Sequence, residues 1–204
     1  MAAADATLPT GAPRYWGVAK AHLRSVDPIV GGYIDRHEGP PREGKGRLFE
    51  TLVHSIVGQQ ISARAADAIW GRVEALVGTF EPSRFDTVGD DALRGAGLSG
   101  RKVEYVNSLA QAIVTGQFDP IALEQQADSQ VIASICMLRG LGRWSAEVYL
   151  MFSLQRPDVF PAGDHALQRA LQKLKGWDNR PSADETRAAV AHWMPWRTVG
   201  SLFL

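Results

Sequence analysis

The chain has 204 residues, of which 45% are hydrophobic, and its 22 basic residues balance its 22 acidic residues. The single cysteine, Cys136, excludes a disulfide framework, and the lack of a Cys/His cluster excludes a structural zinc site or a four-thiolate iron–sulfur cluster. A net charge of zero argues against binding to nucleic acid through the overall field of the protein, so any such contact has to be local.

The sequence carries no segment typical of secretion or of membrane insertion. The N-terminal run "MAAADATLPTGAPR" lacks a basic start followed by an apolar stretch. No apolar run approaches the roughly 20 residues of a membrane span. We therefore expect a cytoplasmic protein without a membrane partner.

Apolar residues recur with helical spacing along most of the chain, while strand-like alternation is nearly absent. Residues 1–13 are expected to be disordered, and residues 14–204 to form one all-α domain, since no linker divides them. The first helix, in "RYWGVAKAHLRSV", would place Val18 and Val26 on one face with its other apolar residues.

The apolar pattern over residues 48–76 is too long for one helix. We expect a break within "VGQQIS", where Ser62 would cap the second half. Further along, Ser99 is the expected N-cap of another helix. The segment "DSQVIASICMLRG" is expected to be helical up to Gly140.

The stretch "MLRGLGRWSAEVYLMF" predicts a turn between two helices over about residues 129–154. Gly140 and Gly142 leave backbone N–H groups open to close approach, and the second helix adds its own unpaired N–H groups and positive dipole end. Such a hairpin can hold a phosphate without net positive charge. From these residues alone, an ordinary helix–helix turn is the simpler interpretation.

The helix that follows begins in "FPAGDHALQRAL". Asp164 stands after Pro161 and Gly163, a position typical of an N-cap, which stabilises a helix by about 1 kcal/mol. Local physics by itself favours this role over a catalytic one.

Together, "VHSIVGQQISARAA", "LRGLGRWSAEVYLMF" and "FPAGDHALQRAL" resemble the motifs of the helix-hairpin-helix DNA glycosylase superfamily, in its alkylated-base, 3-methyladenine DNA glycosylase II branch. The resemblance covers the chain from about Leu48 to its end. It implies a fold of two helical lobes with a cleft between them. It also implies a monomeric, monofunctional glycosylase of base excision repair, associated with the nucleoid if the source is bacterial. Such an enzyme flips alkylated bases, of the 3-methyladenine or 7-methylguanine type, out of double-stranded DNA and hydrolyses the N-glycosidic bond.

The resemblance also assigns residues to roles. Asp164 is the implied catalytic carboxylate, which would stabilise an oxocarbenium-like sugar and orient or deprotonate the attacking water. The implied DNA contacts are Gly140, Leu141, Gly142, Arg143, Ser145, Gln59, Gln60 and Ile61, and the implied base-pocket residues are Trp144, Val148 and His165. No cofactor is implied apart from a Na⁺ or K⁺ ion that hairpin carbonyl groups near Leu138 and Leu141 could hold.

Trp144 stands where the strand-cleaving branches of the superfamily have a lysine that forms a Schiff base with the sugar. Tryptophan cannot form this bond, so we expect hydrolysis without strand cleavage. Its electron-rich ring would also suit a methylated purine that carries positive charge. His165 and Val148 differ from the residues that some relatives have at these positions, so a more open pocket is expected. The chain stops at Leu204, just before a family tryptophan that lines the pocket, so either a trimmed chain or a pocket without that wall is expected.

Alternative interpretations stay open. A non-catalytic helix-hairpin-helix DNA-binding module would use Asp164 only as a cap, and an oxidised-base glycosylase would have lyase activity despite Trp144. Locally, Trp144 could be a packing residue, and Gln59 and Gln60 could be solvated residues at a helix kink.

Overall fold

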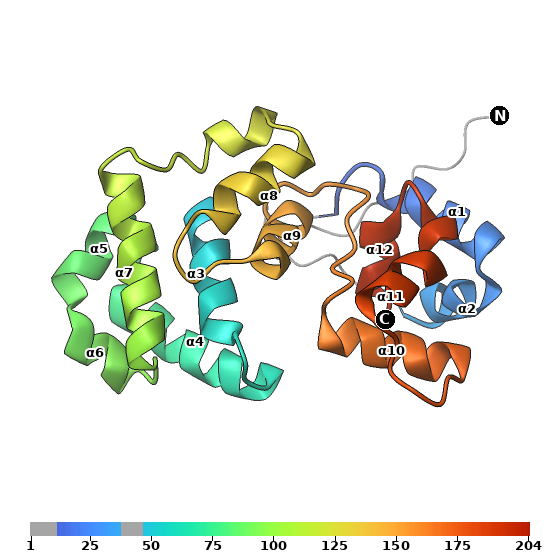
Figure 1. Cartoon of the computed structure of the whole chain (residues 1–204), viewed down its shortest axis with the longest axis horizontal. Helices are drawn as coiled ribbons and strands as arrows, with labels where there is room; N and C mark the ends of the chain where they lie inside the picture. The colour runs from blue at the N-terminus through green and yellow to red at the C-terminus, as the bar shows by residue number, and fades with distance from the viewer. Residues whose placement is uncertain (1–11, 38–46) are drawn as a thin grey trace. The chain divides into compact units, whose positions relative to one another are not determined.

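The computed structural model describes residues 12–37 and 47–204, and within these ranges all regular secondary structure is helical (Figure 1). The prediction of an all-α chain is thus confirmed. The described residues form two compact units: unit 1 contains residues 12–37 and 155–204, and unit 2 contains residues 47–154. Most of the segment expected to be disordered, residues 1–11, lies outside the described residues.

Unit 1 is assembled from both ends of the chain. Its core contains buried side chains from the two segments, among them Trp16, Leu23, Phe160, Leu171 and Trp193. Its helices are α1 (Trp16–Val26), α2 (Pro28–Arg36), α10 (His165–Lys175), α11 (Ala183–Ala189), the short 3-10 helix η2 (Ala191–Trp193) and α12 (Arg197–Leu202). Neither segment has a complete core without the other.

The buried face of α1 is narrower than the sequence predicted. Trp16, Ala19 and Leu23 are at most 2% exposed, whereas Val18 is 63% and Val26 36% exposed. The three buried positions are spaced by three and four residues and so lie on one stripe of the helix, from which Val18 and Val26 are rotated away. The expectation that the latter two share that face was wrong.

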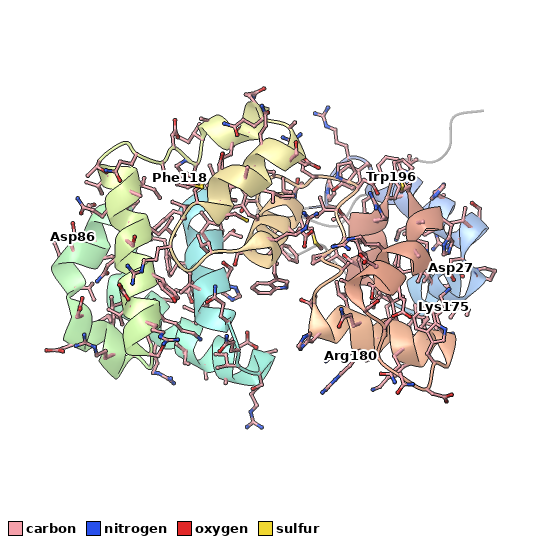
Figure 2. The ribbon with its side chains drawn as sticks, viewed as in Figure 1. Asp27, Asp86, Phe118, Lys175, Arg180 and Trp196 are labelled. Atoms are coloured by element: carbon pink, nitrogen blue, oxygen red, sulfur yellow. The ribbon has the colours of Figure 1, made fainter. Side chains whose placement is uncertain are left out.

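A buried carboxylate links the two segments of unit 1. Asp27 is 3% exposed and caps α2 through its Oδ1 atom. Its Oδ2 atom lies 3.3 Å from Lys175 Nζ, 3.1 Å from His192 Nε2 and 3.0 Å from Trp193 Nε1, and Figure 2 shows Asp27 and Lys175 beside each other. Burial raises the pKa of this carboxyl group, but the hydrogen bonds from Trp193, Val30 and His192 and the charge of Lys175 bring the pKa to about 2.

Unit 2 is continuous in sequence and packs around α3 (Leu48–Gly58), which contacts α4 (Ala63–Val77), α7 (Gly100–Val114) and α9 (Arg143–Phe152). Leu52, Val53 and Ile56 on α3 are fully buried. The remaining helices are α5 (Pro82–Val88), α6 (Asp90–Gly95), the short 3-10 helix η1 (Ala122–Gln125) and α8 (Asp128–Cys136). In Figure 1, α7 runs beside α5 and α6.

Two predicted features of unit 2 are confirmed and one was wrong. The break after α3 lies within "VGQQIS", and Ser62 caps α4 by accepting the N–H of Ala65 at 3.3 Å. Ser99 caps α7 in the same way. However, α8 ends at Cys136 and does not reach Gly140, whose φ of +81° is incompatible with a right-handed helix.

Candidate functional site

The hairpin between α8 and α9 comprises residues 137–142, and its two glycines have different roles. Gly140 has a φ of +81°, and a Cβ atom there would lie 2.2 Å from the ring of Tyr105. Gly142 is the N-cap of α9 with a φ of −130°, and its Cβ would meet nothing within 4 Å. Gly140 is therefore required by backbone conformation and packing, whereas Gly142 leaves the start of α9 open.

The hairpin residues that were predicted to contact DNA could do so mainly through main-chain atoms. The side chains of Leu141 and Ser145 are buried, at 6% and 2% exposed. Arg143 is exposed and its Nε pairs with Glu147 Oε1 at 2.8 Å. The first turn of α9 contains no acidic residue and no side-chain cap, so no carboxylate within that turn offsets the positive end of the helix dipole. This arrangement suits an anion held by backbone N–H groups.

The loop between α3 and α4 lies against this hairpin. The Gln59 side chain is half-buried, and its Nε2 atom donates a hydrogen bond to the carbonyl oxygen of Gly140 at 2.8 Å. Gln60 follows in a left-handed conformation, with a φ of +57°, and its side chain is exposed. Ile61 is 38% exposed. The structure thus brings the predicted loop and hairpin residues together.

The contacts of Lys102 at this junction were not predicted from the sequence, which indicated only that this residue could belong to a local basic patch. Lys102, in the first turn of α7, donates hydrogen bonds from Nζ to the carbonyl oxygens of Val57 (2.7 Å) and Gln59 (2.9 Å). Burial lowers the pKa of its ammonium group. These partners lie 43 and 45 residues away in sequence, so local patterns give no signal for the contact.

In unit 1, Asp164 is the N-cap of α10, as predicted. Its Oδ1 atom accepts the N–H groups of Ala166 (2.7 Å) and Leu167 (3.1 Å), and its side chain is half-buried. Its own N–H donates to the carbonyl of Pro161 at 2.8 Å. His165, the next residue, is exposed. The carboxylate is therefore held at the positive end of a helix dipole, where a negative charge is stabilised.

The connector that leads to Asp164 is fastened to α12. Thr198 Oγ1 accepts the N–H of Val159 at 2.9 Å and donates to the carbonyl of Arg156 at 2.6 Å. Arg197 makes a two-pronged ion pair with Asp158, at 2.7 and 2.8 Å, and this hydrogen bonding raises the pKa of Arg197. These contacts place the peptide before Asp164, and they too join distant parts of the sequence.

The predicted base-pocket residues belong to both units. Trp144 and Val148 lie one turn apart on α9 in unit 2 and are half-buried, whereas His165 starts α10 in unit 1. Within residues 12–37 and 47–204, no group of three or more His, Cys, Asp or Glu side chains could hold a metal ion. The helices in these ranges are also too short or too polar to cross a membrane.

The fold is all-α, with a glycine-containing hairpin between two helices and a carboxylate at the N-terminus of a later helix. These features define a helix-hairpin-helix protein with a candidate catalytic acid. A family model described as "HhH-GPD superfamily base excision DNA repair protein" matches residues 53–195, and the chain belongs to this family. The family assignment made from the motifs is confirmed.

Individual relatives agree with the family. The chain is 26% identical over 197 residues to DNA-3-methyladenine glycosylase 1 of Schizosaccharomyces pombe, covering 91% of this chain and 85% of the relative. The solved structure of S. pombe 3-methyladenine DNA glycosylase in complex with abasic DNA superposes with a TM-score of 0.84 at 25% identity, covering 91% and 94% of the two chains. DNA-3-methyladenine glycosidase from Bacillus halodurans gives 0.72 at 35% identity, covering 91% and 86%.

Proposed function

We propose that this protein is a monofunctional DNA glycosylase that removes alkylated bases from double-stranded DNA, acting as a monomer in the cytoplasm. The observation that carries the proposal is the position of Asp164, a half-buried carboxylate held by two backbone N–H groups at the start of α10. The names of the relatives support the substrate class, because they describe 3-methyladenine glycosylases.

The chemistry follows from the charge of Asp164. Breaking an N-glycosidic bond builds positive charge on the sugar, and a fixed carboxylate stabilises that charge and orients or deprotonates the attacking water. The N–H groups of α10 hold the carboxylate in place. A base that is already positively charged by methylation leaves as a neutral molecule, so the reaction needs little help from a general acid.

Unit 2 would hold the DNA. The main chain of the hairpin would bind a backbone phosphate, and the exposed residues Gln60 and Ile61 would enter the space that the flipped base leaves. A Na⁺ or K⁺ ion bound by the carbonyl groups of Leu138 and Leu141 would help the hairpin to hold the phosphate, since carbonyl oxygens are suitable ligands for such ions. The Leu138 carbonyl accepts one hydrogen bond, from the N–H of Leu141 at 3.2 Å, and has a second lone pair.

The tryptophan at position 144 argues against lyase activity. A Schiff base with the sugar requires an amine, and an indole has none to offer. With Val148 on the same helix, Trp144 would instead contact the flipped base, and its ring would attract a positively charged purine. His165, at the start of α10 in unit 1, stays a predicted base-pocket residue.

The proposal is tested by incubating the protein with duplexes that each contain one defined lesion, and measuring the released base by chromatography. We expect release of 3-methyladenine and 7-methylguanine and none of 8-oxoguanine. Binding to the alkylated duplexes without release of any base would show a DNA-binding module, and preferred release of 8-oxoguanine would show an oxidised-base enzyme.

A further inference from the structure

The first turns of α7 contact both loops that the proposed function assigns to DNA. Lys102 Nζ donates hydrogen bonds to the carbonyl oxygens of Val57 and Gln59, at the end of α3. One turn later on the same helix, Tyr105 packs so closely against Gly140 that no Cβ atom would fit between them. Helix α7 is therefore in contact with the α3–α4 loop through one residue and with the hairpin through another.

Gln59 joins the same two loops directly. Its carbonyl oxygen is bound by Lys102, and its side chain donates to the carbonyl of Gly140 at 2.8 Å. On the outside of this junction, Glu104 of α7 pairs with Arg139 of the hairpin, with 2.7 Å between Oε1 and the guanidinium nitrogen. Both the main chain and the side chain of Gln59 are thus fixed, and the hairpin is held on two sides.

Gln60 comes directly after this fixed residue. Its φ of +57° is a conformation that residues with a Cβ atom rarely adopt. A non-glycine residue persists there when its surroundings determine the backbone. Lys102 and the side-chain bond of Gln59 provide such surroundings, while the Gln60 side chain itself is exposed.

We propose that Lys102 is a positioning residue for base flipping, because its ammonium group binds the carbonyl oxygens of Val57 and Gln59 and so fixes Gln60 relative to the hairpin. The inference rests on the proposed function, in which this loop enters the duplex. The two glutamines then have different roles: Gln59 holds the loop against the hairpin, and Gln60 fills the space left by the flipped base.

A compact ammonium group suits this place. The last carbonyl groups of a helix have no partner within the helix and carry the negative end of its dipole, so a half-buried cation such as Lys102 satisfies both. Two of the three N–H donors of Lys102 are used by these carbonyl groups. Lys102 therefore acts on the loop and contributes little to phosphate binding.

The test uses the full chain with Lys102→Met, which keeps an unbranched side chain one atom shorter and removes its donors. Two duplexes each contain one 7-methylguanine, opposite cytosine in the first and opposite an abasic site in the second, where the lesion leaves the stack at little cost. Loss of two charge-assisted hydrogen bonds should slow single-turnover release about 10- to 100-fold on the first duplex. On the second duplex, and in the Kd for undamaged DNA, the variant should stay within about threefold of wild type.

Two further variants keep the test decisive. Lys102→Arg, which keeps the positive charge and the N–H donors but not the compact ammonium group, should recover part of the rate on the first duplex. Gln59→Leu, which removes the bond to Gly140, should reproduce the pattern of Lys102→Met, and it carries the test if Lys102→Met does not fold. The thermal midpoint of each variant shows whether it folds.

Three outcomes would overturn the positioning role. Equal losses on both duplexes would indicate a general structural defect, wild-type rates on both would show that the contacts are unnecessary, and a Kd weakened more than about tenfold would indicate a direct phosphate contact. If the wild-type protein releases no base from either duplex, the proposed function fails, and this result is distinct from the other three.

Discussion

The two units are stabilised in different ways, although both are entirely helical in their described residues. Unit 1 contains a buried carboxylate, Asp27, bound by groups from the other end of the chain, and a second, partly buried ion pair between Asp158 and Arg197. In unit 2, the ion pairs made by Arg47, Arg94, Arg139 and Arg143 all have an exposed basic partner.

Unit 2 has a buried carboxylate of its own, Glu147 on α9, but this residue pairs with a neighbour on the same helix, and aromatic packing joins the other helices. Trp70 stacks on Phe80 with ring centres 4.6 Å apart and meets His54 at 4.7 Å, while Phe85 packs edge-on against Phe49 at 5.3 Å. The contacts of Trp70, Phe80, Phe85 and Phe49 with one another contain no titratable group and are therefore insensitive to pH. The comparison indicates that the stability of unit 1, which carries Asp164, depends more on charge, and that the stability of unit 2, which carries the hairpin, depends more on packing.

The largest effect is expected from Asp164→Asn in unit 1. Asparagine caps a helix as well as aspartate does, so the thermal midpoint should stay near that of wild type. Since the amide carries no negative charge, single-turnover base release should fall by about 10²- to 10⁴-fold. Both quantities can be measured on the same preparation. If Asp164→Asn retained the base-release activity, Asp164 would act only as a helix cap.

Asp27→Asn should destabilise the protein by about 3 kcal/mol, because an amide cannot accept from Lys175, His192 and Trp193 as a carboxylate does. For a chain of this size, the thermal midpoint should fall by roughly 6–12 °C. The matched control in unit 2 is Asp91→Asn, which removes an exposed pair with Arg94 and should cost about 0.5 kcal/mol or less. Equal effects of the two variants would contradict the difference between the units.

The same carboxylate predicts a pH dependence. The pKa of Asp27 is about 2 in the folded protein, below its ordinary value of 3.8. Its ionised form is therefore favoured by folding, and this stabilisation is present above about pH 4 and is lost as the pH falls through 2. The stability difference between wild type and Asp27→Asn, measured by urea unfolding, should shrink over that interval. A constant difference would mean that the charge of Asp27 contributes nothing.

Gly140→Ala should destabilise unit 2 by about 2 kcal/mol, since alanine disfavours the positive φ and its Cβ would displace the Tyr105 ring. DNA affinity should fall with stability. Gly142→Ala is the control: its Cβ meets no protein atom within 4 Å, so the thermal midpoint should be unchanged while the methyl group hinders approach of a phosphate. If Gly140→Ala melts like wild type, the packing account of the hairpin is wrong.

The smallest effect is expected from Arg101→Gln. Arg101 is exposed beside Lys102, and no acidic partner for it is found among the described residues. Its removal should weaken DNA binding about two- to threefold and reduce the slope of log K against log salt by roughly 1. Arg187→Gln in unit 1, where the arginine pairs with Asp184, should leave the slope unchanged. An unchanged slope for Arg101→Gln would place this arginine outside the DNA interface.

Local signals made much of this protein predictable from its sequence. Ser62, Ser99 and Asp164 cap helices as predicted because capping depends on residues two or three positions away. The roles of the hairpin residues came from motif resemblance. The contacts of Lys102 and Asp27 were not predictable, because their partners are distant in sequence and follow no periodic pattern.

The most direct test of the central claim is the identity of the products of a single turnover on a duplex with one 7-methylguanine, with borohydride present to trap any Schiff base. Hydrolysis by Asp164, with tryptophan at position 144 in place of a lysine, predicts one free base and one uncleaved strand with an abasic site for each enzyme molecule, and no covalent adduct. A borohydride-stabilised adduct between protein and DNA, or a cleaved strand, would contradict it.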